Sequence, residues 1–250
     1  MGLIEKNDEK SGLPNILYDN KPFFEMLDGI SNKNLVFYTI GNSDDAYNSR
    51  NGKKKEFGEQ LEKKGCKLLN NTYSITKNND TLWIMQFTDL FVTRIKLDRI
   101  KEKIAGCNDK DELEALKLEE QYLLRYKNLW DEIKPVDIVV ALTHYPPTRQ
   151  HLESISSTNK EGFNLILAGH YHGGQIRIPF YGAIYIPAPT LPRSGWFPPQ
   201  DVVSGLRNYG KSYIYISRGL GSSGSCKMLS FRLFNTPEIN IITLAGKEQV

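Results

Sequence analysis

The turn from Ala168 to Gln175 constrains the fold and the chemistry of this chain more than any other stretch. Its sequence, AGHYHGGQ, holds two of the four histidines in the chain. The apolar run before it, Phe163 to Leu167, predicts a buried strand, so the turn lies at the carboxyl end of that strand. Ligands bind at this edge of open α/β sheets. His170 and His172 are therefore candidate ligands for zinc, iron and similar ions. The alternative is an exposed glycine-rich loop.

A second predicted strand brings a third histidine to the same edge. The run from Val136 to Leu142 is apolar, and two prolines end it shortly after His144. The gap between the two strands accommodates a parallel crossover with a short helix over residues 150–158. The three imidazoles are then expected at one edge of the sheet. His151 lies at neither strand end, so we expect it to be solvated.

A third apolar run, Leu35 to Ile40, ends in a polar turn. The residues that follow it are Gly41, Asn42, Ser43, Asp44 and Asp45. Taken alone, such residues are ordinary turn formers or helix caps.

Three segments resemble, in this order, the last three motifs of the calcineurin-like metallophosphoesterases. They are Gly41 to Asp45, Leu142 to Pro146 and Gly169 to Gln175. The bacterial branch with the motif Gly-His-Thr-His-Gly-Gly-Gln, often tethered to membranes, is the most similar. Two later stretches, Tyr215 to Gly221 and Phe231 to Ile239, resemble the same branch. The His-x-His-Gly-Gly-Gln motif is the most specific of these signals.

The resemblance implies an α/β fold, built as a four-layer αββα sandwich of two mixed sheets. It also implies two divalent cations, manganese, zinc or iron, of which this chain could hold only one. Asn42, His144 and His170 correspond to ligands of the second cation, and His172 corresponds to a ligand of the first. A zinc ion can bind three such ligands and leave open positions for water or substrate.

Arg218 is the candidate for holding a substrate phosphate. It follows a predicted strand end, and the planar guanidinium suits phosphate oxygens. Arg177 and Arg193 are further candidates, although each of the three could equally be a surface or ion-pair residue.

Two departures from the family pattern lower the expected activity. Family members carry Asp-x-His and Gly-Asp-x-x-Asp motifs further upstream, which supply first-metal ligands and a bridging aspartate; neither occurs before Gly41. Ser43 stands where the family has a histidine, paired with the aspartate that is here Asp44. That histidine serves as general acid or stabilises the transition state. Serine does not donate a proton at useful pH, and a positioned acid contributes about 10²–10⁴-fold.

Three functions remain open, of which a nucleic-acid-binding module of the same superfamily fold is the least supported. The first is a metal-dependent phosphoesterase-like protein, impaired in activity, that hydrolyses a phosphodiester or pyrophosphate bond of a phosphorylated small molecule or lipid. The second is a catalytically degenerate relative that binds a ligand or serves as a scaffold. The missing motifs fit either a sequence that starts downstream of the true N-terminus or a degenerate relative. Ser43 favours degeneracy, because truncation does not change an internal residue.

Composition narrows further the classes of protein to which the chain can belong. The formal net charge of +3 is too small to favour nucleic-acid binding. The three cysteines, Cys66, Cys107 and Cys226, lack metal-type spacing and indicate free thiols. The longest apolar runs are strand-sized, and no signal peptide is recognisable. We expect a cytoplasmic protein or one peripheral to a membrane, with no integral membrane segment in this chain.

We expect a single metallophosphoesterase-like domain over residues 1–250, N-terminally incomplete and with a poorly defined segment at 1–33. Helical periodicity over residues 94–134, interrupted at Gly106 to Asp109, predicts an inserted helical hairpin. The proline-rich segment from Pro187 to Val203 is expected to stay irregular and to border the site. Further apolar patterns predict a helix at 53–64 and strands at 66–69, 72–76, 82–87, 175–178, 183–186, 212–216, 228–233 and 239–244.

Overall fold

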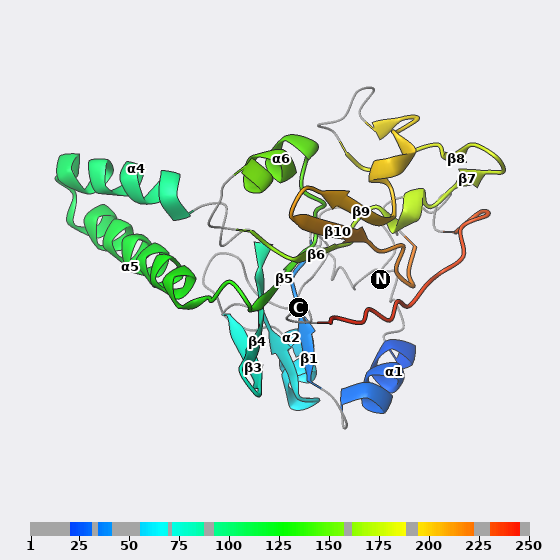
Figure 1. Cartoon of the computed structure of the whole chain (residues 1–250), viewed down its shortest axis with the longest axis horizontal. Coiled ribbons are helices and arrows are strands. Elements are labelled where there is room, and N and C mark those ends of the chain that lie inside the picture. Colours follow the sequence, from blue (N-terminus) through cyan, green and yellow to red (C-terminus); the bar gives the residue numbers. More distant parts are fainter. Residues whose placement is uncertain are drawn as a thin grey trace, which may run out of the picture.

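The computed structural model describes residues 21–31, 35–41, 56–69, 72–87, 93–157, 162–188, 195–222 and 231–245. Helices alternate with parallel and antiparallel strands along the chain (Figure 1), so the predicted α/β class is confirmed. The four-layer sandwich stays a prediction, since within the described residues the second sheet consists of the short strands β1 (Val36–Tyr38) and β2 (Cys66–Leu68).

A six-stranded mixed sheet forms the centre of the molecule. Its spatial order is β3-β4-β5-β6-β10-β9, with parallel pairing from β4 to β10 and an antiparallel strand at each edge. The strands are β3 (Tyr73–Lys77), β4 (Asp80–Gln86), β5 (Ile138–Thr143), β6 (Leu165–Ala168), β9 (Gly205–Tyr209) and β10 (Ser212–Ile216). Parallel strands buried on both faces carry nearly continuous apolar runs, which is why β5 and β6 were recognisable from sequence.

The crossover that follows β5 positions the histidines. Helix α6 (Arg149–Ser157) connects β5 to its parallel neighbour β6, as the spacing predicted. Thr143 and Ala168 are paired in register at the ends of these two strands, so the segments that follow leave the sheet side by side. Buried Leu152 of α6 packs with Phe163, Ile166 and other apolar side chains in the largest core cluster.

A buried carboxylate ties two strands of the sheet together. Asp137, just before β5, is 7% exposed. It accepts hydrogen bonds from Trp83 Nε1 at 2.9 Å, from the Lys134 backbone N–H at 2.9 Å and from the Thr81 backbone N–H at 3.3 Å. Buried carboxylates persist where donors satisfy them, so Asp137 fixes the start of β5 against β4.

A smaller unit lies beside the sheet. Helices α1 (Lys21–Ser31) and α2 (Glu56–Lys63) pack on the parallel pair β1–β2. The rings of Phe23, Phe24 and Phe57 contact one another at this junction, with Phe23 stacked on Phe57 and the other two pairs tilted. Helix α1 falls within the segment expected to be poorly defined, and that expectation is wrong for residues 21–31. The aromatic residues of α1 pack against Phe57 of α2, which is distant in sequence, so the local sequence pattern did not reveal the helix.

Helices α4 (Thr93–Gly106) and α5 (Lys110–Glu132) form the predicted hairpin and extend away from the sheet on the left of Figure 1. Asp109 begins α5, and its side chain accepts from the backbone N–H groups of Asp111 and Glu112. The two helices share a small apolar cluster of their own. That the hairpin is an insertion stays a prediction. None of the described helices combines the length and the apolar composition that a membrane crossing requires.

The carboxyl-terminal third is less regular than predicted. A 3₁₀ turn, η1 (His172–Gly174), is followed by the short hairpin β7 (Arg177–Ile178) and β8 (Gly182–Ala183), and η3 (Gln200–Val202) precedes β9. The predicted strand at 239–244 is wrong, because no ladder forms along it. Of the predicted strand at 228–233, Leu233 makes a single bridge to Ile176, and 228–230 lie outside the described residues.

Candidate metal site

Two histidines from neighbouring strand ends meet. His144 follows β5 directly, and His170 lies two residues beyond β6. The Nε2 atom of His144 is 3.0 Å from the Nδ1 atom of His170, and the rings meet edge to face with centroids 4.8 Å apart. The contact arises because β5 and β6 are adjacent and parallel, so that both turns leave the sheet at the same edge.

Pro187 determines which nitrogen of His170 carries the proton. The Nε2 atom of His170 is 3.1 Å from the Pro187 carbonyl oxygen, which only accepts hydrogen bonds. In the neutral ring Nε2 therefore donates, and Nδ1 presents its lone pair towards His144. Backbone carbonyls orient metal-binding histidines in this way. Pro187, the first residue of the proline-rich segment, thus contacts His170, while residues 189–194 of that segment lie outside the described residues.

His172 is held by a carbonyl as well. Its Nδ1 atom is 3.1 Å from the Gly221 carbonyl oxygen, so Nδ1–H donates and Nε2 retains the lone pair. The backbone carbonyl of His172 accepts from Asn235 Nδ2 at 2.6 Å and from Arg232 Nη1 at 3.2 Å. Both the ring and the backbone of His172 are therefore fixed by residues that follow in the sequence.

Arg232 is the residue that holds the surrounding loops together. Besides His172, it donates to the carbonyl of Gly221 from Nε at 2.8 Å and to that of Arg218 from Nη2 at 2.7 Å. Sequence reasoning missed the roles of Arg232 and Asn235. The signal was present, because both lie in the stretch from Phe231 to Ile239 that resembles the phosphoesterase branch.

The backbone of the histidine turn is strained. His170 has φ 67° and His172 has φ 50°, in the left-handed region that non-glycine residues rarely adopt. Such residues cost about 1–3 kcal/mol each and persist where the surrounding structure imposes them, often at functional sites. Gly173 and Gly174 also have positive φ, and a Cβ on Gly174 would lie 2.2 Å from the Ala183 Cβ. Gly174 therefore lets the turn pack closely on β8, and Gly173 lets it pack against Arg218 and Asn235.

The end of β1 reaches His144. A Cβ on Gly41 would lie 2.7 Å from His144 Nδ1, so the imidazole rests directly on the glycine backbone. Asn42 is the next residue in the chain. Asn42, Ser43 and Asp44 lie outside the described residues. The contact places Gly41, the residue before Asn42 in the sequence, against the His144 ring.

Burial lowers the pKa of all three imidazoles, which favours their neutral forms. Burial, reinforced by the neighbouring His170 and His172, lowers the pKa of His144 to about 4. Burial also lowers the pKa of His172 to about 4, and the charge of Arg232 contributes to this shift. Burial lowers the pKa of His170 against the opposing effect of its bond to Pro187. Neutral imidazole is the form that binds a metal ion.

The contact between the two rings is a hydrogen bond, in which His144 Nε2–H donates to the lone pair of His170 Nδ1; a cation bound by both nitrogens would replace this proton. Imidazole nitrogens bound at about 2.1 Å to one ion lie about 3 Å apart when the two bonds meet at a right angle, as in octahedral coordination, and about 3.4 Å apart in the tetrahedral geometry typical of zinc. The observed Nε2–Nδ1 separation is 3.0 Å. Within the described ranges, no three His, Cys, Asp or Glu side chains converge on one ion position. Any further ligand would come from outside the described residues. Asn42 is a candidate, because it follows Gly41 directly in the chain.

Comparison with known proteins identifies the family. The family model for calcineurin-like phosphoesterases matches residues 15–174, well over half of the chain. The chain belongs to the calcineurin-like phosphoesterase family. Members of this family generally bind divalent metal ions and act on phosphate esters.

Three curated relatives match shorter segments. The uncharacterized metallophosphoesterase YkuE of Bacillus subtilis is 35% identical over 107 residues, which are 42% of this chain and 30% of that protein. Phosphodiesterase YaeI of Escherichia coli is 30% identical over 105 residues, 42% of this chain and 32% of that protein. The uncharacterized metallophosphoesterase Cj0846 of Campylobacter jejuni is 36% identical over 110 residues, 44% of this chain and 23% of that protein. The matches thus span a third or less of these relatives. No solved structure matches the chain significantly.

The candidate phosphate-binding arginines of this phosphoesterase chain have distinct surroundings. Arg177 donates to the Gly173 carbonyl at 2.8 Å and so supports the histidine turn. Arg218 lies near Gly173, where a Cβ would come within 2.7 Å of its Cγ, and its Nε is 3.8 Å from a carboxylate oxygen of Glu238. Arg193 lies outside the described residues. His151 is exposed on α6, as predicted.

Proposed function

We propose that this chain binds a divalent cation through His144 and His170 and hydrolyses a phosphodiester or pyrophosphate bond at a reduced rate. The observation that carries the proposal is the 3.0 Å approach of His144 Nε2 to His170 Nδ1, with the latter nitrogen left unprotonated by Pro187. Asn42 is proposed as a further ligand of the same cation. His172 is proposed as a ligand of a first cation, in the family's order.

The residues around His144 and His170 hold the histidine side chains in fixed orientations. The carbonyls of Pro187 and Gly221 fix the tautomers of His170 and His172. The ion that these side chains would hold, manganese, zinc or iron, supplies positive charge to the phosphoryl oxygens. Pre-formed geometry spares the cost of reorganising ligands during the reaction.

Excess positive charge beside the histidine turn supports an anionic substrate. Burial, together with the charge of Arg218, lowers the pKa values of both Arg177 and Arg232. Glu238 is the carboxylate that contacts this arginine group in the described part of the chain. We propose that Arg218, which keeps donors beyond its contact with Glu238, binds a phosphate of the substrate.

The leaving group follows from Ser43. Without a histidine there, substrates whose leaving group needs no proton, such as a nucleotide phosphate or an aryl oxide, are affected least. The similarity to YaeI, which is named a phosphodiesterase, supports the diester class. We therefore propose a phosphorylated small molecule or lipid as the substrate, hydrolysed in the cytoplasm or at a membrane surface.

The test is hydrolysis of an aryl phosphodiester with manganese, zinc or iron added in turn. We expect slow turnover that is abolished by His170→Ala and unaffected by His151→Ala, which removes an exposed histidine of α6. Ser43→His should raise the rate, by about tenfold or more for an alkyl leaving group and by less for an aryl one. Absence of turnover in both the parent and Ser43→His, with all three metals, would reject hydrolysis and leave the ligand-binding or scaffold function.

A further inference from the structure

An aromatic patch lies next to the histidine turn, on two turns that are bridged to each other: the β7–β8 hairpin and the bend at Trp196 and Phe197. We define it as Phe180, Tyr181, Tyr185, Trp196 and Phe197. The rings contact one another: Tyr185 and Trp196 have centroids 5.0 Å apart, and Tyr181 and Phe197 have centroids 6.1 Å apart. The Phe197 backbone N–H donates to the Ile184 carbonyl at 2.7 Å, so the two turns form one surface.

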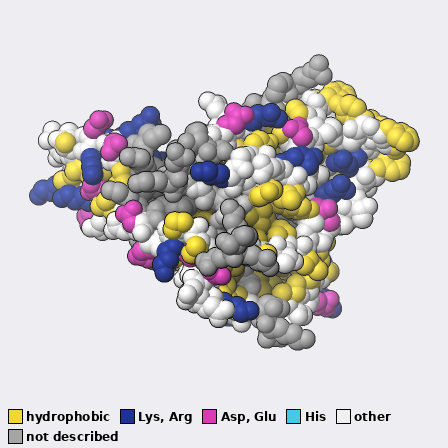
Figure 2. Space-filling model, viewed as in Figure 1, with side chains coloured by type: hydrophobic (Ala, Val, Ile, Leu, Met, Phe, Trp, Pro, Cys, Tyr) yellow, Lys and Arg dark blue, Asp and Glu magenta, His cyan; other side chains and the backbone are white. Residues whose placement is uncertain are grey.

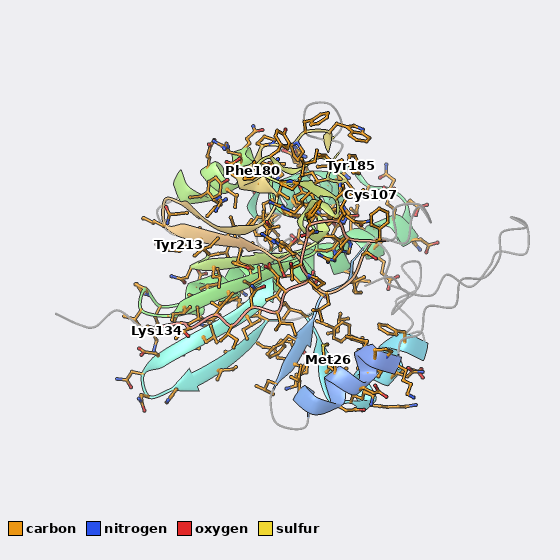
Figure 3. The ribbon with its side chains drawn as sticks, turned by 90° about the vertical axis from the view of Figure 1, so that its right-hand side faces the viewer. Met26, Cys107, Lys134, Phe180, Tyr185 and Tyr213 are labelled. Atoms are coloured by element: carbon orange, nitrogen blue, oxygen red, sulfur yellow. The ribbon has the colours of Figure 1, made fainter. Side chains whose placement is uncertain are left out.

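The aromatic patch faces outward. Phe180, at the tip of the β7–β8 hairpin, is fully exposed, and Trp196 and Phe197 are each 52% exposed. Figure 2 shows hydrophobic side chains gathered over β7 and β8, with Lys and Arg side chains close by. Figure 3 shows Phe180 and Tyr185 at the opposite end of the molecule from Met26 of α1. The patch is a protrusion rather than a groove.

Backbone strain separates this patch from ordinary surface aromatics. Phe180 has φ 68° and Phe197 has φ 50°. Bulky residues rarely adopt this left-handed region, where asparagine or glycine is preferred. Because Phe180 is fully exposed, packing within the monomer does not offset the strain. Strained, exposed aromatic residues point to a contact outside the chain.

The charge around the patch favours an anionic partner. Within the described residues 162–188 and 195–201, the charged side chains are Arg177 and Asp201, and Asp201 is paired with Arg149 at 3.0 Å, which leaves the charge of Arg177 in excess. The chain as a whole carries a formal net charge of +3. A surface of negative charge is therefore attracted to this part of the molecule rather than repelled.

We propose that the aromatic patch inserts into the interfacial layer of a lipid bilayer that contains anionic headgroups. Tryptophan and tyrosine combine an apolar ring with a polar edge, which suits the boundary between headgroups and acyl chains. A convex pair of turns can insert into a bilayer, whereas binding of a peptide would require a groove. This inference goes beyond the proposed hydrolysis and does not depend on it.

The geometry links the patch to the candidate metal site. Arg177 of β7 donates to the Gly173 carbonyl at 2.8 Å, and Gly174 packs closely on Ala183 of β8. The hairpin that carries Phe180 is therefore fixed to the histidine turn. A docked hairpin would hold that turn at a constant distance from the lipid headgroups.

The test is flotation with vesicles of phosphatidylcholine alone or mixed with phosphatidylglycerol. We expect binding to the mixed vesicles and a blue shift of tryptophan fluorescence that disappears in Trp196→Ser. Phe180→Asn and Trp196→Ser should each weaken partitioning by about tenfold. Leu118→Ser is the matched control, because Leu118 on α5 is 62% exposed and lies outside the patch.

Phe180→Asn also separates docking from a structural role. Asparagine tolerates the left-handed backbone, so this variant should unfold at the same or a higher temperature while it loses vesicle affinity. Equal vesicle binding by parent and patch variants would overturn the proposal. A dimer in sedimentation that the patch variants dissolve, without vesicle binding, would also overturn it and assign the patch to a second copy. Binding is measured without metal, so its outcome is independent of hydrolysis.

Discussion

At the residue scale, the Asp137 carboxylate shows how a single buried group couples the fold to pH. Burial alone would raise its pKa, but hydrogen bonds from Trp83, Lys134 and Thr81 bring the pKa below the ordinary aspartate value. A lowered pKa in the folded state means that the unfolded state binds the proton more readily. The stabilisation is therefore present above the unfolded pKa and is lost as the pH falls through the folded one.

Asp137→Asn should lower the free energy of unfolding by about 2–4 kcal/mol at neutral pH, because an amide cannot accept from all three donors. Urea unfolding at neutral pH and in acid checks this. The parent should lose stability on acidification more steeply than the variant. An unchanged unfolding midpoint at neutral pH would show that the carboxylate does not hold β4 to β5.

Arg232 is a second residue whose loss should affect more than one segment, because its side chain donates to several backbone carbonyls. Arg232→Ala leaves the carbonyls of His172, Gly221 and Arg218 without this donor and should cost about 1–3 kcal/mol. Hydrogen exchange at residues 170–175 should become faster. Arg207→Ala, which removes an exposed arginine of β9, is the control and should leave both measurements unchanged. Equal effects of the two variants would contradict the role of Arg232.

At the scale of elements, the sequence predicted those that are recognisable from local pattern. Strands β5 and β6 carry continuous apolar runs, and the α4–α5 hairpin has helical periodicity with a clear break. Strand β9 was missed because its residues are largely exposed at a sheet edge. The strand expected at 239–244 has the right β-branched residues, but a strand also requires a neighbour, and none lies along it in the described part of the chain.

The close packing of the histidine turn on β8 predicts that a side chain at Gly174 lowers stability. Gly174→Ala should lower stability by about 2–4 kcal/mol, since the new methyl group would overlap Ala183 and the positive φ penalises any side chain. Gly106→Ala at the end of α4 is the matched control, because no atom lies within 4 Å of its Cβ position. Thermal unfolding of both variants checks this. A neutral Gly174→Ala would contradict the close packing of the turn on β8.

At the scale of the whole molecule, the sequence predicted that β5 and β6 would bring their histidines to one edge, because parallel neighbours end together. It could not predict the carbonyls of Pro187 and Gly221 that set the tautomers. Those contacts join segments far apart in the chain and depend on the tertiary fold. The same holds for Arg232, which joins the histidine turn to the loop that follows β10.

Calorimetric titration of the metal-free protein with zinc tests most directly whether His144 and His170 share a cation. The parent should bind zinc, and His144→Ala and His170→Ala should each weaken the affinity at least about tenfold, while His151→Ala should not change it. Because the two ligands serve one ion, the double variant should lose little more than either single variant. Zinc affinity that is unchanged in both single variants, or lowered equally in His151→Ala, would contradict a shared site at the β5–β6 edge.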